Sequence, residues 1–233
     1  MGLYDRDYAR GNSAFSYGSA SKSEAQIVTF VKETYKLFAA SMMAGAVGAY
    51  VGVPMAATIA SWYLPLFVLE IALLFGLFAV KHKPGINLAV MFGFVFMTGL
   101  MLAPLLSHTL GMSGGGTVIG NAFAMTSVIF GSMSYFAIKS TKDFTGYGKP
   151  LMIALFVIIG FSIVNLFLGS PILAIGISAV VVVLFSILVV FDTQNIIKGN
   201  YETPIDGAIA LYLDFLNIFT ALLHLFGIFG SDD

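Results

Sequence analysis

Residues 151–168 read LMIALFVIIGFSIVNLFL and residues 172–197 read ILAIGISAVVVVLFSILVVFDTQNII, with only Gly169-Ser170-Pro171 between them. An α-helix rises about 1.5 Å per residue, so roughly 20 residues cross the ~30 Å of hydrocarbon in a bilayer. Both stretches are therefore long and apolar enough to cross. Because glycine and proline mark turns, the three residues between them predict a tight antiparallel hairpin of two membrane-spanning helices.

The composition of the whole chain is typical of a membrane protein. Of its 233 residues, 58% are hydrophobic and 10% are charged, and the mean hydropathy is +0.94. A soluble domain carries about 25% charged residues, so this chain has too few charges to cover an apolar core in water. It contains no cysteine, which excludes disulfides and thiolate metal sites.

Five further apolar stretches of spanning length bring the total to seven. The predicted spans are residues 35–53, 63–80, 86–106, 117–138, 151–168, 172–197 and 207–229. Turns rich in glycine and proline separate them. The sequence therefore predicts an all-α polytopic membrane protein, with a seven-helix transmembrane bundle over residues 27–233. Residues 1–26 are rich in glycine, serine, tyrosine and charge, and are predicted to form a flexible cytoplasmic tail without a signal peptide.

The basic residues predict the orientation, because cytoplasmic loops of membrane proteins carry an excess of lysine and arginine. The eleven Lys and Arg divide five, two, three and one between the N-terminal segment and every second loop. They are Arg6, Arg10, Lys22, Lys32, Lys36, Lys81, Lys83, Lys139, Lys142, Lys149 and Lys198. Seven spans place all of them on one side. We therefore expect the N-terminus in the cytoplasm and the acidic end Ser231-Asp232-Asp233 outside.

Two rows of small residues, each with a spacing of four, predict close packing between helices. The rows are Ala40, Ala44, Gly48 and Gly52 in the first span and Gly116, Gly120 and Ala124 in the fourth. Small residues at this spacing let helix backbones approach closely in lipid. We interpret both rows as contacts within one molecule and expect a monomer.

Few ionisable side chains fall inside the predicted spans. They are Glu70, Asp192, Asp214 and His224, with Lys81 at the inner edge of the second span. A charge at the bilayer centre costs about 3 kcal/mol on insertion scales, so such residues are functional candidates. Structural interpretations stay open: Asp192 as a solvated residue at a frayed helix end, and Asp214 or Glu70 as a structural residue, for Asp214 through an interhelical hydrogen bond. His224 is interpreted as an interfacial residue.

Two of the acidic residues are predicted to meet. If Lys198 marks the inner end of the sixth span, Asp192 lies roughly 9 Å into the membrane. Asp214 lies roughly 11–12 Å above the start of the antiparallel seventh span. Two carboxylates at matched depth in a poorly solvated site titrate as a unit. The pair is a candidate pH sensor, and its charged form is a candidate site for a hard cation such as Ca²⁺.

The residues around both aspartates resemble the paired signature of the Bax inhibitor family, whose bacterial members are small inner-membrane proteins. The motifs are residues 191–197 (FDTQNII) and 211–219 (LYLDFLNIF), and residues 34–52 and 98–106 carry further similarity. The resemblance implies a seven-helix bundle with the last helix surrounded by the other six. It also implies a pH-dependent calcium leak in a bacterial inner membrane.

The same resemblance implies roles for individual residues. Asp192 and Asp214 correspond to a di-aspartyl sensor, and Lys81 is the best match to a basic residue, usually arginine, that pairs with the sensor. In the implied mechanism a shared proton keeps the pore closed. Deprotonation makes the carboxylates repel, releases the second span and lets Glu70 help to conduct a cation.

A second hypothesis is a regulatory role. Some bacterial relatives are linked to a membrane-anchored ATP-dependent protease, and the tail of residues 1–26 is suitable for capture by such a machine. An enzyme is not expected, because the chain lacks His-Glu-x-x-His, a phosphate-binding Gly-Lys-Ser/Thr loop and a Gly-x-Ser-x-Gly elbow. No cofactor is expected. Nucleic-acid binding is not expected either, because the basic residues are spread over four segments. The predicted partners are therefore the lipid bilayer and calcium ions.

Overall fold

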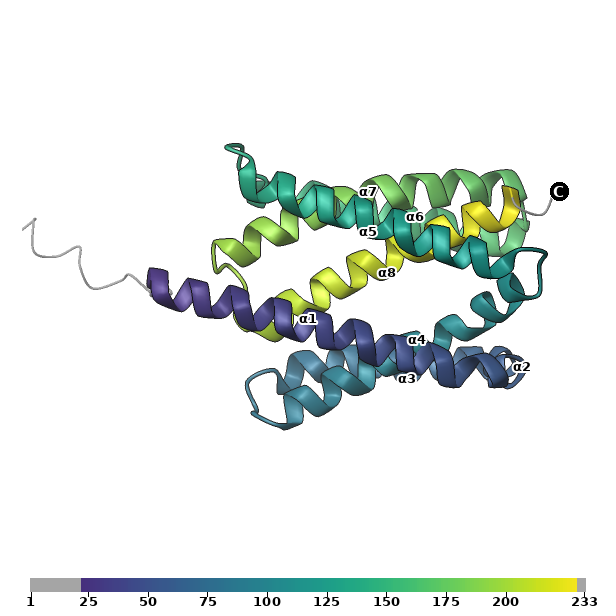
Figure 1. Cartoon of the computed structure of the whole chain (residues 1–233), viewed down its shortest axis with the longest axis horizontal. Helices are drawn as coiled ribbons and strands as arrows, with labels where there is room; N and C mark the ends of the chain where they lie inside the picture. Colours follow the sequence, from purple (N-terminus) through teal and green to yellow (C-terminus); the bar gives the residue numbers. More distant parts are fainter. Residues whose placement is uncertain (1–21, 230–233) are drawn as a thin grey trace, which may run out of the picture.

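A computed structural model describes residues 22–229, and all of the regular structure in that range is helical (Figure 1). The long helices are α1 (Glu24–Gly52), α3 (Tyr63–Val80), α4 (Ile86–Leu110), α5 (Gly115–Lys139), α6 (Gly148–Leu168), α7 (Pro171–Ile197) and α8 (Pro204–Phe229). The short elements are α2 (Ala56–Ser61) and two 3₁₀ turns, Val53–Met55 and Thr145–Tyr147. Within the described range, seven helical segments are long and apolar enough to span a membrane. The predicted seven-span, all-α architecture is confirmed.

The first helix begins earlier than the predicted span. Ser23 and Gln26 form a reciprocal capping box, in which the Ser23 hydroxyl accepts from the Gln26 N–H and the Gln26 side chain accepts from the Ser23 N–H. This arrangement starts the helix at Glu24, inside the segment predicted as a tail. The first turns are polar, so a search for apolar runs does not detect them. The rest of the predicted tail, residues 1–21, and the C-terminal acidic end lie outside the described residues.

The predicted hairpin between α6 and α7 is present. Gly169 ends α6 with φ 59°, in the left-handed region that favours glycine. The Ser170 hydroxyl then accepts from the Leu173 N–H, and Pro171 occupies the first turn of α7. Each residue of the Gly-Ser-Pro turn therefore has a distinct role in ending one helix and starting the next.

Helix α8 lies at the centre of the molecule. In Figure 1 it runs obliquely between α5, α6 and α7 on one side and α1, α3 and α4 on the other. It packs against α7, α1, α5 and α4, and its buried side chains contribute to the two largest apolar clusters. The central last helix implied by the family resemblance is therefore present.

Helices α1 and α4 cross at glycines. A Cβ atom added to Gly99 would collide with the backbone of Gly45, and one added to Gly48 would collide with the backbone of Phe96. At Gly52 an added Cβ would lie 2.7 Å from the Cβ of Ala103. These backbones are close enough that only glycine fits at the crossing.

The two predicted rows of small residues have different outcomes. Gly48 and Gly52 of the first row lie in the α1–α4 contact, as predicted. The second row is exposed, and an added Cβ at Gly116 or Gly120 would meet no atom within 4 Å. The intramolecular contact predicted for that row is wrong, because α5 turns other residues, such as Ala122, Thr126 and Phe130, toward the core.

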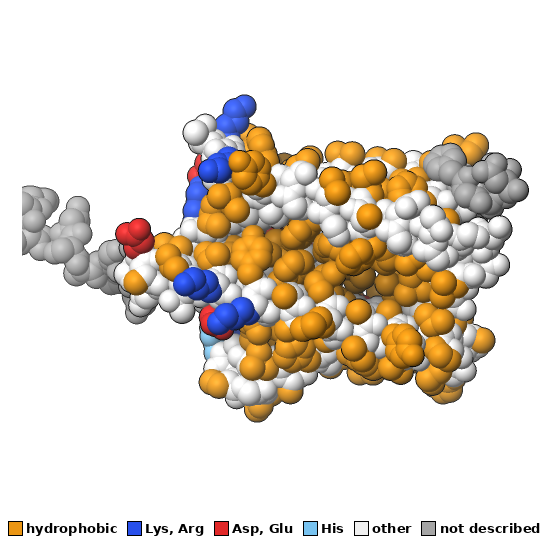
Figure 2. All heavy atoms as spheres, viewed as in Figure 1, with side chains coloured by type: hydrophobic (Ala, Val, Ile, Leu, Met, Phe, Trp, Pro, Cys, Tyr) orange, Lys and Arg blue, Asp and Glu red, His pale blue; other side chains and the backbone are white. Residues whose placement is uncertain are grey.

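Charged side chains gather at one end of the bundle. Figure 2 shows lysine side chains together at the left of the visible face, with apolar side chains over most of the remainder. We call this the basic end; it comprises the start of α1 and the loops that follow α3, α5 and α7. The opposite end comprises α2 and the loops that follow α4 and α6, which contain no Lys or Arg.

The glycine crossing generates a stability prediction. We expect Gly99→Ala to lower the free energy of unfolding in detergent by about 1–3 kcal/mol, because the added methyl group overpacks a backbone contact. Gly93→Ala, on the same helix where an added Cβ meets nothing within 4 Å, is the matched control and should have a smaller effect. Thermal unfolding of the two purified variants measures the difference. Equal losses of stability would show that the crossing is not tightly packed.

Candidate functional site

Asp192 and Asp214 meet inside the bundle near the basic end. They lie on α7 and α8, with exposed fractions of 6% and 3%. Their carboxyl groups are within hydrogen-bonding distance of each other. In the described residues, Asp214 Oδ2 is buried and receives no hydrogen bond from any donor group. The predicted depth match therefore corresponds to a direct contact between the two side chains.

The chemistry of this contact depends on one proton. Two ionised carboxylates are acceptors only and repel each other. When one carboxyl is protonated, its O–H donates to the other, and the repulsion becomes an attraction. Gain or loss of a single proton therefore changes the sign of the interaction between α7 and α8 at this point.

A tyrosine in the loop between these helices completes the site. The Tyr201 hydroxyl donates to Asp192 Oδ1 at 2.6 Å. Burial, with the nearby Asp192 carboxylate, raises the pKa of Tyr201, so the phenol keeps its proton and remains a donor. Asp192 thus has one neutral donor on one side and the Asp214 carboxyl on the other.

The start of α1 holds the loop that carries Tyr201. Lys22 Nζ donates to the carbonyl oxygens of Gly199 at 2.9 Å and Tyr201 at 2.6 Å. The same ammonium lies 3.7 Å from the centre of the Phe30 ring. These contacts connect the first helix to the α7–α8 loop directly at the aspartate site.

The polar residues after Asp192 attach α7 to its neighbours. Gln194 Nε2 donates to the carbonyl oxygens of Lys142 at 2.9 Å and Ala137 at 3.3 Å, and its Oε1 accepts from the Phe144 N–H at 2.7 Å. Thr193 donates to Ser134 on α5 at 3.4 Å. All three bonds of Gln194 go to α5 or the α5–α6 loop, so this side chain fixes α7 in place.

Asn195 and Lys198 fix the end of α7 in the same way. Asn195 Oδ1 accepts from Asn200 Nδ2 at 2.9 Å, and Lys198 forms an ion pair with Asp143 at 2.6 Å. The hydrogen bond from Lys198 keeps the pKa of Asp143 well below its usual value. Asp143 therefore remains ionised, and this pair persists at every pH near neutrality.

Lys81 does not contact the aspartates. Its ammonium pairs with Glu202 at 2.6 Å and lies 3.9 Å from Asp206, and within residues 22–229 it forms no ion pair with either aspartate. Lys81 follows the last residue of α3 and lies beside the α7–α8 loop, whereas Asp214 is two turns of α8 beyond Asp206, roughly 12 Å deeper. The expected contact between Lys81 and the sensor is therefore replaced by a contact with the loop that carries Tyr201.

Glu70 and His224 occupy different surroundings. Glu70 is half-buried on α3, and within the described range it makes no hydrogen bond or ion pair. His224, predicted to be interfacial, is half-buried, and its Nδ1 lies 3.0 Å from the Ser178 hydroxyl. His224 therefore links α8 to α7 near the opposite end.

The described residues hold no group of three or more His, Asp or Glu side chains that could bind a metal ion. Asp192, Asp214 and the Tyr201 hydroxyl supply oxygen atoms, the ligand type that Ca²⁺ prefers. A resident Ca²⁺ takes 6–8 oxygen ligands, more than these side chains offer. These three groups alone therefore do not complete the ligand set of a resident Ca²⁺.

Several site residues could not be identified from the sequence alone. In the sequence, Lys22 lies in the predicted tail, Tyr201 lies in a predicted loop, and Gln194 belongs to a motif without an assigned role of its own. A usable signal does exist in the run Asp192 to Asn195. Four consecutive polar residues occupy every side of a helix, so they cannot all face lipid and require polar neighbours.

Gln194 generates the second stability prediction. Gln194→Ala removes the hydrogen bonds to the Phe144 N–H and to the carbonyl oxygens of Ala137 and Lys142, of which only Lys142 has a second donor, Ser140, so we expect a loss of about 1–3 kcal/mol in the free energy of unfolding. Ser127→Ala removes an exposed hydroxyl that bonds only within its own helix, and should change stability by less than about 0.5 kcal/mol. Thermal unfolding in detergent compares the two. A Gln194→Ala variant as stable as Ser127→Ala would contradict the anchoring role.

Comparison with known proteins gives consistent matches over nearly the whole chain. The family model described as inhibitor of apoptosis-promoting Bax1 matches residues 27–231. An uncharacterized protein of Campylobacter jejuni is 48% identical over 238 residues, covering 99% of this chain and 100% of that protein. An uncharacterized protein of Helicobacter pylori strain 26695 is 42% identical over the full length of both chains. A Vibrio cholerae protein described as an uncharacterized membrane protein is 34% identical over 87% of this chain and 91% of its own.

Proposed function

This chain belongs to the Bax inhibitor-1 family of multi-span membrane proteins, and we propose that it is a pH-sensitive cation leak channel, with calcium as its cargo, gated by Asp192 and Asp214. The observation that carries the proposal is the contact of these two buried carboxyl groups beneath Tyr201. The proposed location is a bacterial inner membrane with the basic end in the cytoplasm. The lysine-rich loops at that end support this orientation.

In the proposed closed state the aspartates share one proton. The O–H of one carboxyl donates to the other and holds α7 against α8, while Tyr201 donates to Asp192. Lys22 and Lys81 keep the α7–α8 loop over the site through their contacts with Tyr201 and Glu202. Passage at the basic end is then blocked by packed helices and this loop.

Loss of the shared proton opens the channel in this proposal. Two ionised carboxylates repel, α7 and α8 separate near the basic end, and the loop that contacts Lys81 moves with them. The freed oxygen atoms attract a cation. Glu70, which has no ion-pair partner in the described residues, offers the next negative charge along the path.

The Lys81–Glu202 pair does not explain a response between pH 5 and 8. His82 Nε2 also lies 3.3 Å from the Glu202 carboxylate and forms an ion pair with it only when the imidazole is protonated, so His82 needs its own control variant. The hydrogen bond to Lys81 lowers the pKa of Glu202, and the same bond raises the pKa of Lys81. A carboxylate whose pKa is lowered on folding stabilises the protein above its ordinary pKa and loses that effect only as pH falls below it. The stabilisation by this pair is therefore constant from pH 5 to 8, and the pH dependence of flux has to come from other groups.

The direct test is Ca²⁺ flux into liposomes that contain the purified protein, measured from pH 5 to pH 8. We expect flux to rise with pH in the unmodified protein. Asp192→Asn and Asp214→Asn should each remove most of the pH dependence, because one carboxyl alone has no charged partner to repel. Histidine is the side chain that ordinarily changes charge in this range, so variants with His82, His108 or His224 replaced by Gln are the controls.

Two results would contradict the proposal. Unchanged flux and an unchanged pH profile in both aspartate variants would exclude the pair as the sensor. Loss of the pH profile only in a histidine variant would assign sensing to that histidine. Parallel measurements with Na⁺ and K⁺ identify the preferred cation.

Tyr201→Phe tests the hydroxyl without changing the ring. Removing a donor to the Asp192 carboxylate disfavours its charged form, so the midpoint of the flux profile should move to higher pH. A hydrogen bond to a charged group contributes about 1.5–3 kcal/mol, which corresponds to roughly 1–2 pH units. A shift to lower pH would show that Tyr201 stabilises the protonated pair instead.

The Lys81–Glu202 pair is tested by reversing its charges. Lys81→Glu should increase flux at pH 5 a few-fold, because the loop loses an attractive contact and gains a repulsive one. The double variant Lys81→Glu with Glu202→Lys should return flux toward the original level. Since Lys81 does not touch the aspartates, the midpoint pH should stay nearly constant in both variants. A large midpoint shift would instead place Lys81 in the sensor.

A further inference from the structure

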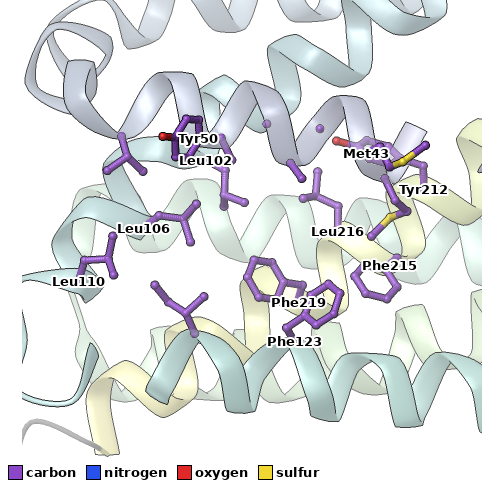
Figure 3. Close-up of a pocket in the computed structure, with 17 residues that line it drawn as sticks. Met43, Tyr50, Leu102, Leu106, Leu110, Phe123, Tyr212, Phe215, Leu216 and Phe219 are labelled. Carbon is purple, nitrogen blue, oxygen red and sulfur yellow. The ribbon is translucent and has the colours of Figure 1, made fainter. Parts of the chain in front are cut away.

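A second feature of the molecule lies on the other side of α8 from Asp214, because Tyr212, Phe215 and Leu216 point about 100–200° away from it around the helix axis, and it extends toward the opposite end. A cavity of about 610 Å³ lies between α1, α4, α5 and α8. Figure 3 shows Phe215 and Phe219 of α8 and Phe123 of α5 along one side of it, and Tyr50 of α1 with Leu102 of α4 along the other. Asp192, Asp214 and Glu70 do not line this cavity; it shares only helix α8 with the proposed ion path.

The lining is almost completely apolar. Its only polar side-chain atoms are the hydroxyls of Tyr50 and Tyr212. The Tyr212 hydroxyl is already bonded to Thr98 and to the carbonyl oxygen of Val95. A polar ligand or a bare cation would therefore lose its hydration without gaining partners. The chemistry of the walls suits a hydrocarbon ligand.

The cavity opens sideways between α1 and α5. These helices meet near the basic end, where the rings of Phe38 and Phe130 stack at 5.2 Å. Further along α1, toward the opposite end, the residues at the rim of the cavity are exposed. The accessible fraction of the surface is 67% for Met43 and 82% for Tyr50. Because the helices span a membrane, these exposed apolar residues face the acyl chains of lipid, and the cavity is continuous with the bilayer interior.

The length of the cavity along the membrane normal matches the hydrocarbon thickness of one leaflet. The α1 side of the lining runs from Met42 to Val53, roughly 16 Å of helix. This is close to half of the ~30 Å hydrocarbon thickness of a bilayer. Tyr50 lies toward the end of this stretch, where a tyrosine suits the boundary between acyl chains and headgroups.

We propose that this cavity is a binding site for one acyl chain of a phospholipid from the leaflet at the opposite end. The chain enters between α1 and α5 and lies against Phe215 and Phe219, while the headgroup stays near the level of Tyr50. This inference does not depend on the proposed channel activity.

The test uses lipid whose acyl chains carry bromine, which quenches tryptophan on contact. Trp62 is the only tryptophan, so Trp62→Phe gives a silent background. In that background Phe219→Trp places a reporter on the cavity wall. Only 8% of the surface of Phe219 is accessible, so its main route of contact with lipid is the cavity. Leu184→Trp places a matched buried reporter between α6 and α7, away from the cavity. We expect brominated phosphatidylcholine to quench the Phe219→Trp reporter several-fold more than the Leu184→Trp reporter.

A blocking substitution separates entry into the cavity from general exposure. Ala46 lines the cavity, whereas the next residue, Val47, is an exposed residue outside the lining. Ala46→Phe should abolish the excess quenching, and Val47→Phe should leave it unchanged. Mass spectrometry of purified protein gives an independent measure: Ala46→Phe should retain less phospholipid than Val47→Phe.

Three outcomes would overturn the proposal. Equal quenching of the two reporters would show that no acyl chain reaches the α8 wall. Excess quenching that survives Ala46→Phe would show that the bromine arrives by another route. Quenching that appears only when the protein is diluted into excess lipid would show that a second copy of the chain occupies the site at high protein density.

Discussion

The contact between Asp192 and Asp214 constrains the rest of the basic end. An acidic side chain inside a membrane-spanning bundle is costly unless its oxygen atoms have partners. Here each aspartate has the other as its neighbour, and only Asp192 also has a donor, Tyr201. One oxygen of Asp214 has no hydrogen-bond partner among the described residues, and a proton shared by the two carboxyl groups would replace their repulsion by an attraction. In the proposed mechanism, the protonation of this pair therefore controls the stability of the α7–α8 contact.

In the proposed mechanism, the α7–α8 loop transmits the separation of the two aspartates to other helices. It is held by Lys22 at the start of α1, by Lys81 at the end of α3 through Glu202, and by Asp192 through Tyr201. Three helices from both sides of the bundle thus meet at one short segment. Separation of α7 from α8 displaces Tyr201, and the displacement reaches α1 and α3 through direct contacts. Because α3 carries Glu70, the half-buried acid without a partner in the described region, the loop also connects the sensor to the proposed ion path.

The sequence predicted the features that follow from apolar length and helical rise. The seven spans, the Gly-Ser-Pro hairpin and the matched depth of the two aspartates depend only on these quantities. It could not predict the partner of Lys81, because spacing along α3 gives the height of a residue and not the direction in which the side chain points. It misassigned Gly116, Gly120 and Ala124 for the same reason: small residues permit close packing but do not indicate which face meets a helix. Lys22 and Tyr201 were missed because both lie outside regular apolar segments, where no periodicity restricts their position.

Helix α8 relates the two sites along its length. Asp214 faces the polar contacts of the basic end, and Tyr212, Phe215 and Phe219 line the apolar cavity. The bonds of Tyr212 to Thr98 and Val95 of α4, one turn or less from Asp214, fix the rotation of α8 about its axis. An acyl chain bound against Phe215 and Phe219 would therefore contact the helix that, in the proposed mechanism, moves when Asp214 loses its proton. Since a ligand shifts an equilibrium only by its difference in affinity for the two states, an acyl chain that fits the cavity in one position of α8 and not in the other would favour that position. Lipid composition and pH would then act on two faces of one helix.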